Sequence, residues 1–195
     1  MIGKDIHRLK VKGWEKSYHS HGPRKQAGVA ILISNKINFK PKLIKKDKEG
    51  HYILLKGTIH QQDITIINLY APNNGAATFI KQTLLKFKNQ INHNTIIMGD
   101  FNTPLSPLDR SSRQKLNKET IELNSTIDNL DLTDIYRIYQ PSSSGYTGCS
   151  GTRHSPGEYC ASSTLPMEAL HHLGGGASSV FQVSNIFLLF FFYLS

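Results

Sequence analysis

Short apolar runs alternate with polar segments along the first 140 residues, and each run has the length of a β-strand. Residues 28–34 form a continuous apolar run, which predicts a strand buried on both faces. Residues 52–59 and 63–70 predict two strands, and the three residues 60–62 between them suit a hairpin. Residues 95–98 predict a further buried strand.

Two segments between these runs have the apolar spacing of helices. Thr78 is the expected N-cap of the first helix. Its apolar side is formed by Phe79, Ile80, Leu84, Phe87 and Ile91. Asn117 is the expected N-cap of the second helix. Its apolar stripe is formed by Leu123, Ile127 and Leu130. Strands covered by helices predict an α+β chain, in outline a layered α/β sandwich.

The chain changes character after Pro141, because 18 of the last 55 residues are Ser or Gly. Such a stretch buries too little apolar surface to offset its ordering entropy, so we expect no regular structure in residues 142–179. The apolar run at residues 186–194 is shorter than a membrane-spanning helix requires. Two interpretations of this run stay open: a marginal tail anchor, or an aggregation-prone or out-of-frame translation product.

Positive charge is concentrated in residues 1–140, which carry 22 Lys or Arg against 12 Asp or Glu. This part of the chain is therefore expected to attract a polyanion such as DNA or an anionic membrane surface, although a solvated lysine-rich surface has the same composition. The densest basic segment, residues 40–48 (KPKLIKKDK), suits a loop that contacts a DNA backbone and a solvated turn equally well.

The cysteines and the N-terminus bear on cellular location. Cys149 and Cys160 are separated by ten residues and have no second cluster that would complete a zinc site. This usage predicts a reducing compartment. The first residues lack the apolar core of a secretory signal, so we expect a protein that is not secreted.

The candidate chemistry lies in two short motifs that follow apolar strands, residues 68–73 (NLYAPN) and 98–102 (MGDFN). Side chains alternate along a strand, so Asp100 and Asn102 are expected on one side, where both can reach one phosphate or its attacking water. The same pair also suits an Asx turn and cap with no catalytic role.

These two motifs, together with residues 104–110 (PLSPLDR), closely resemble the endonuclease domain of the long interspersed element retrotransposon polyprotein, within the endonuclease/exonuclease/phosphatase superfamily. The resemblance runs from about His7 through Thr147. It implies a four-layered α/β sandwich that nicks one DNA strand with Mg²⁺ and leaves a 3′-hydroxyl to prime reverse transcription. The implied division is a partial domain at residues 1–147 and a divergent Gly/Ser-rich tail at residues 148–195.

The resemblance also implies roles for individual residues. Asp100 would orient or deprotonate the attacking water, Asn102 would hold the scissile phosphate, and the Tyr70 phenol would lie near that phosphate. Such groups suit phosphodiester cleavage, which needs a positioned nucleophile and donors for the phosphoryl charge. Three further residues are implied to contact the DNA substrate: Arg110, Arg113 and Thr147.

The chain departs from the family at both ends of this resemblance. The family has an early Gln-Glu segment whose glutamate holds the metal and closing Asp-His segments whose histidine completes the site, and neither dipeptide occurs here. His154, His171 and His172 are not expected to replace that histidine. We therefore expect a fragment truncated at both ends, with weakened Mg²⁺ binding and little nicking activity.

Two alternatives to an endonuclease fragment remain open at this point. One is a catalytically inactive basic module that contacts the DNA backbone without sequence preference, and the other is a non-functional translation product. In each case we expect no small-molecule cofactor and no membrane partner. The resemblance implies a nuclear or cytoplasmic location.

Overall fold

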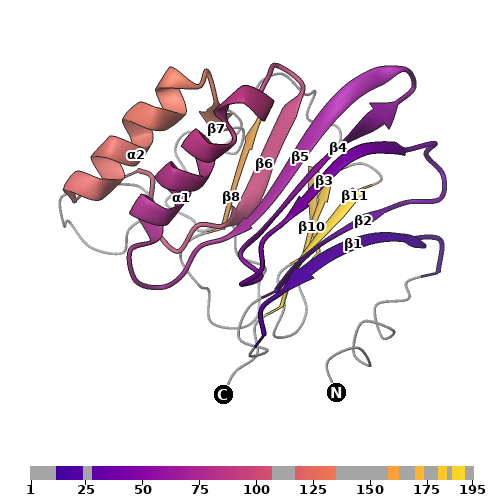
Figure 1. Cartoon of the computed structure of the whole chain (residues 1–195), viewed down its shortest axis with the longest axis horizontal. Helices are drawn as coiled ribbons and strands as arrows, with labels where there is room; N and C mark the ends of the chain where they lie inside the picture. Colours follow the sequence, from indigo (N-terminus) through magenta and orange to yellow (C-terminus); the bar gives the residue numbers. More distant parts are fainter. Residues whose placement is uncertain are drawn as a thin grey trace. The chain divides into compact units, whose positions relative to one another are not determined.

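The computed structural model describes residues 12–23, 28–106 and 117–134, together with four strands between residues 158 and 191. The chain divides into two compact units. The first consists of Met1–Ile64 and Pro166–Ser195, and the second of Thr65–Leu165. Figure 1 shows the helices and strands of both units, most of them with their labels.

The first unit is built from antiparallel strands. Its elements are β1 (Lys16–His21), β2 (Gly28–Ile33), β3 (Lys40–Lys46), β4 (Tyr52–Ile59), β9 (Leu170–Leu173), β10 (Val180–Val183) and β11 (Ile186–Phe191). One sheet has the order β1-β2-β11-β10-β9, and every pair in it is antiparallel. In addition, β3 pairs antiparallel with β4, with a register shift between Pro41 and Leu43.

Strand β2 is buried over its whole length, as its continuous apolar run predicts. It pairs with β1 on one side and with β11 on the other, so it is an inner strand of its sheet. The apolar run near the C-terminus thus supplies a sheet strand, in which Ile186 is the register partner of Ile33.

Most of the basic segment at residues 40–48 is a strand, which corrects the loop or turn expected for it. Its first seven residues form β3, in which every residue is exposed except the half-buried Leu43. Lysines interrupt the apolar residues of this strand, and Pro41 lacks an amide hydrogen. Lysine and proline on an exposed strand discourage a further strand from pairing with it. The charge of β3 therefore protects the strand from edge-to-edge association.

The predicted hairpin turn is present between β4 and β5 (Gln62–Tyr70), a strand that runs from the first unit into the second. The turn residues His60 and Gln61 have positive φ angles of 48° and 68°, as in the tight turns that suit the twist of antiparallel strands. Next to the turn, the Asp63 carboxylate accepts hydrogen bonds from the Thr58 hydroxyl at 3.0 Å and the Lys42 ammonium at 2.5 Å. Both bonds lower the pKa of Asp63.

The second unit combines a mixed sheet with two helices. Its further elements are α1 (Ala76–Lys86), the 3-10 helix η2 (Lys88–Gln90), β6 (Thr95–Asp100), α2 (Lys118–Asn129), β7 (Thr133–Asp134) and β8 (Glu158–Ser162). Strand β5 pairs parallel with β6, which pairs antiparallel with β8, and β8 pairs antiparallel with β7. The two helices pack side by side (Figure 1). They are joined by an ion pair between Lys81 and Glu122 at 2.7 Å.

The second predicted helix cap is confirmed and the first is wrong. The Asn117 side-chain oxygen accepts a hydrogen bond from the Thr120 amide at 2.7 Å and so caps α2. Helix α1 begins at Ala76, ahead of Thr78, and its N-cap Gly75 adopts a left-handed conformation with φ 71°. This conformation, which glycine adopts without strain, lets the chain enter the helix directly after the turn.

The predicted apolar stripes are confirmed in part. On the first helical segment, Ile80, Leu84 and Phe87 are buried, while Phe79 and Ile91 are half-buried. On α2, Leu123 is buried and Ile127 and Leu130 are half-buried. The remaining buried positions of α2 are the threonines Thr120 and Thr126, which an apolar pattern does not detect.

The prediction that residues 142–179 lack regular structure is wrong, because β8 and β9 lie within that range. Strand β8 lies between β6 and β7, and β9 pairs with β10. Sheet ladders are made by backbone groups, so a polar segment without apolar periodicity can still extend an existing sheet.

No helix in the part of the chain that the structure describes is long and apolar enough to cross a membrane.

Removing the α2 cap tests this part of the fold. Asn117→Ala leaves the Thr120 amide without its side-chain acceptor, and we expect the free energy of unfolding to fall by about 1 kcal/mol. Chemical denaturation measures this change. Asn129→Ala at the exposed far end of the same helix is the matched control, and an equal loss in both variants would contradict the capping role.

Candidate active site

Tyr70 and Asp100 lie at the carboxyl ends of the two parallel strands of the second unit. They are register partners in the β5–β6 pair, so both side chains start from the same edge of the sheet. The backbone amide of Ala71 donates to the Asp100 carbonyl at 2.8 Å, which continues the ladder one residue beyond the pair. Backbone pairing therefore fixes the spacing between Tyr70 and Asp100.

Gly99 allows the close approach of these two strands. A Cβ atom built on Gly99 would lie 2.1 Å from the Leu69 carbonyl oxygen, far inside a normal contact distance. The neighbour is backbone, which cannot turn away as a flexible side chain can. The position before Asp100 therefore requires glycine for the observed pairing.

Asp100 and Asn102 come together through a turn. The strand ends at Asp100, and Asn102 has a positive φ of 46°, so the alternation expected from an extended segment does not apply. Instead, Asp100 Oδ1 accepts a hydrogen bond from the Asn102 amide at 3.1 Å, which confirms the Asx turn. The Asn102 side chain reaches back to the residue directly after β5, where Nδ2 donates to the Ala71 carbonyl at 2.7 Å.

The environment of the site keeps the Tyr70 phenol protonated. Asp100 is 1% exposed, and Tyr70 is half-buried. Burial raises the pKa of Tyr70 above its ordinary value, and the Asp100 carboxylate raises that pKa further, because both disfavour a phenolate. A neutral phenol beside a carboxylate can donate a hydrogen bond to an anionic ligand.

Helix α2 supports the loop that follows Asn102. The Thr103 and Thr120 hydroxyls are 3.4 Å apart in a buried contact. Asn124 Nδ2 donates to the Leu105 carbonyl at 2.8 Å. These supporting residues do not stand out in the apolar pattern of the sequence. The sequence does contain one indication of Thr120, because this residue lies three positions before Leu123 and hence on the apolar side of the helix.

Several predicted site residues cannot be placed by the structure. Arg110, Arg113 and Thr147 lie outside the described residues, as does His154, for which no catalytic role is expected. His171 and His172 are on β9 of the first unit. Glu158 on β8, an acidic residue outside the site predicted from the sequence, is the register partner of Asp100.

The described residues do not form a complete site for a divalent metal ion. Across residues 12–23, 28–106 and 117–134, no group of three or more His, Cys, Asp or Glu side chains is placed to hold one. Asp100 supplies a carboxylate, but Mg²⁺ requires near-octahedral oxygen coordination. The described residues therefore do not fit the metal that the sequence resemblance implies.

The Tyr70 environment can be tested by titration. We expect the Tyr70 phenol to lose its proton at higher pH than an exposed tyrosine, and Asp100→Asn to lower its pKa by removing the neighbouring negative charge. NMR of ¹³Cζ-labelled tyrosine, assigned with Tyr70→Phe, measures both. Asp128→Asn on the exposed side of α2 is the control, and an unchanged Tyr70 pKa in Asp100→Asn would contradict the proximity of the two groups.

Solved structures with a similar fold include several enzymes that act on nucleic acids. The endonuclease domain of TRAS1, a telomere-specific non-LTR retrotransposon, matches with a TM-score of 0.55 at 12% identity, over 92% of this chain and 80% of that one. An AP endonuclease from Archaeoglobus fulgidus gives 0.59 at 17% identity, over 100% of this chain and 84% of that one. The 3′ phosphatase NExo from Neisseria, bound to a product DNA hairpin, gives 0.56 at 14% identity, over 96% and 82%.

At such low identities these structures establish the fold alone, and they confirm the predicted α+β class. The sequence itself matches the model of one family over residues 3–161, well beyond half of its length. The chain belongs to the Endonuclease/Exonuclease/phosphatase family.

Proposed function

We propose that Tyr70, Asp100 and Asn102 form the phosphodiester-binding part of a DNA endonuclease site of the retrotransposon kind. The observation that carries the proposal is the convergence of a buried carboxylate, a neutral phenol and an amide at the ends of two parallel strands. Open α/β sheets bind ligands at the carboxyl ends of their parallel strands. The reaction would be hydrolysis of one phosphodiester bond in one strand of a DNA duplex.

Each residue has a distinct role in this proposal. Asp100 accepts hydrogen bonds only, so it orients the attacking water or takes its proton. Tyr70 keeps its proton at neutral pH and donates to a phosphoryl oxygen, on which negative charge builds up during the reaction. Asn102 uses one amide hydrogen to hold the Ala71 carbonyl and has a second for the phosphate.

We further propose that this chain alone cleaves DNA only near background. In the family the reaction uses Mg²⁺, which would neutralise phosphoryl charge, and the described residues do not supply a ligand set for that ion. The sequence also lacks the Gln-Glu and Asp-His dipeptides that mark the remaining site segments of the family. The residues in place would then position a phosphate without efficient hydrolysis.

A plasmid-nicking assay with Mg²⁺ tests both proposals. We expect near-background nicking by the 195-residue chain. We expect nicking to be restored when the missing family segments are added on both sides of residues 7–147. In the extended protein, Asp100→Asn or Asn102→Ala should lower the rate on the order of 10²-fold, the effect of losing one group that acts on the transition state.

Asp128→Asn is the control for the nicking assay, since it removes an exposed carboxylate of α2. It should leave the rate of the extended protein unchanged. Nicking by the unextended chain that disappears in Asp100→Asn would overturn the proposed inactivity. An extended protein that nicks DNA equally well without Asp100 would overturn the proposed site.

A second candidate function, binding to the DNA backbone without cleavage, is favoured by the exposed lysines of β3. Lys40, Lys45 and Lys46 are exposed along this strand, as is Lys42, which forms an ion pair with Asp63. A row of ammonium groups attracts phosphates at any sequence, and the released counterions make the affinity fall steeply with salt.

Salt dependence tests this second function. We expect the Lys40→Gln/Lys45→Gln double variant to bind duplex DNA more weakly and to reduce the slope of log K against log salt by about 2. Fluorescence anisotropy with a labelled duplex measures both. Lys88→Gln/Lys118→Gln, which removes two exposed lysines of the second unit, is the matched control. An equal reduction in the two double variants would show that β3 has no special role.

A further inference from the structure

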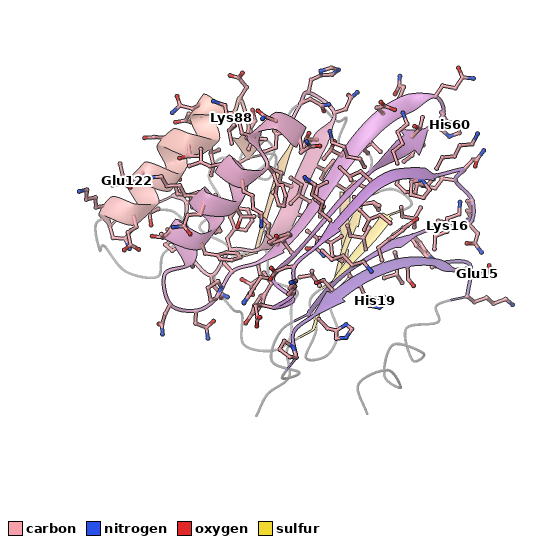
Figure 2. The ribbon with its side chains drawn as sticks, viewed as in Figure 1. Glu15, Lys16, His19, His60, Lys88 and Glu122 are labelled. Carbon is pink, nitrogen blue, oxygen red and sulfur yellow. The ribbon has the colours of Figure 1, made fainter. Side chains whose placement is uncertain are left out.

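Two histidines lie close together on β1, the edge strand of the first unit's sheet. His19 and His21 are two residues apart, so strand alternation places them on the same side. Their rings are stacked, with centroids 5.8 Å apart and an angle of 21° between the ring planes. Among the strands that the structure describes, β1 pairs with β2 alone, and Figure 2 labels His19 on this strand. The pair is therefore carried by the edge strand of the described sheet.

One ring nitrogen of His19 makes no hydrogen bond to the described part of the chain. Its Nδ1 atom is buried and has no hydrogen-bond partner in the part of the chain that the structure describes. A buried polar atom without a partner costs free energy, and binding of a ligand would recover part of that cost. The neighbouring His21 is exposed, so the pair can be reached from solvent.

The surroundings keep His19 neutral at physiological pH. Burial lowers the pKa of His19 below its ordinary value, and the positive charges of Lys46 and His21 lower that pKa further. A neutral imidazole presents a lone pair, which is the form that binds a metal ion. The same Lys46 charge opposes a cation, which lowers the affinity of the pair for a metal ion.

The segment at residues 47–49, which contains two acidic residues, packs against the end of β1. The Ser20 hydroxyl donates to the Asp47 carbonyl, and a Cβ on Gly22 would lie 2.5 Å from the Glu49 carbonyl oxygen. The Asp47 carboxylate accepts a hydrogen bond from the His51 amide, whereas the Glu49 side chain is exposed. Both contacts are made by backbone carbonyls, so the segment packs directly beside the end of β1.

The separation of the two rings suits a shared metal ion. A bound metal lies about 2.0–2.1 Å from an imidazole nitrogen and hence about 3.2 Å from the ring centre, so two rings on one ion have centres roughly 5–6.5 Å apart. The observed 5.8 Å falls within this range. Rotation of the rings about their side-chain bonds would turn one nitrogen of each toward a common point.

We propose that His19 and His21 bind one divalent transition-metal ion of the Zn²⁺ class. Imidazole nitrogen suits zinc, copper and nickel, and Mg²⁺ prefers oxygen. Water completes the coordination, so the affinity is lower than that of a four-ligand structural zinc site. The site lies in the first unit and does not include the residues proposed for DNA cleavage, so its test is independent of the nuclease proposal.

Zinc titration of the full chain tests the proposal. Calorimetry with Zn²⁺ alone at pH 7.5 measures the association constant of each bound equivalent. We expect His19→Gln and His21→Gln each to lower this constant at least about tenfold for one equivalent. Even the loss of a residue that only supports a metal ligand lowers metal affinity by that factor. His93→Gln, which replaces an exposed histidine of the second unit, is the control and should leave the titration unchanged. At pH 5.5 this equivalent should bind more weakly, because protons compete for the imidazoles.

Imidazole NMR provides a second measurement that does not depend on counting zinc ions. The ring ¹⁵N signals of both His19 and His21 should move together as Zn²⁺ is added to the unmodified protein. Loss of zinc affinity in either variant together with these joint shifts supports the site. An unchanged titration in the His19→Gln/His21→Gln double variant, or ring signals that do not respond to Zn²⁺, would overturn it.

Discussion

The close pairing of β5 with β6 is the constraint on which the candidate active site depends. Gly99 lies against the Leu69 backbone so tightly that no larger residue fits without movement of one strand. This contact sets the register in which Tyr70 faces Asp100. The turn after Asp100 then brings the Asn102 amide back to the end of β5. Three polar groups thus converge because of backbone geometry.

The pairing also accounts for the electrostatics of the site. Main-chain bonds hold Asp100 in a buried position, where its charge and the loss of solvent both favour a protonated Tyr70 phenol. Helix α2 braces the next part of the loop through Thr120 and Asn124. A site built from fixed donors and acceptors can bind a phosphate without first reorganising.

Much of this arrangement could be predicted from the sequence, because local patterns determine it. The buried strand β2 follows from an uninterrupted apolar run, and the Asn117 cap follows from a side chain that can accept the Thr120 amide. The motif at the end of the strand before Asp100 indicated Asp100 and Asn102 as candidates, and the family resemblance added Tyr70. The start of α1 could not be predicted from an N-cap preference, because a left-handed glycine set it.

Features that depend on long-range pairing were missed for a different reason. Strands β8 and β9 form where a sheet edge accepts their backbone groups, and the Ser/Gly-rich sequence carries no sign of it. The same holds for the exposed basic strand β3, whose partner β4 determines its conformation. The turn at Asn102 likewise replaced the extended geometry expected from alternation.

Amide hydrogen exchange in Gly99→Ala tests the central role of the strand pairing most directly. The added Cβ should force β5 and β6 apart at their carboxyl ends and weaken the bond from the Ala71 amide to the Asp100 carbonyl. The account predicts a clear loss of protection at the Ala71 amide, with the amides of β2 in the first unit still protected. Unchanged protection at Ala71 in a folded Gly99→Ala protein would contradict it.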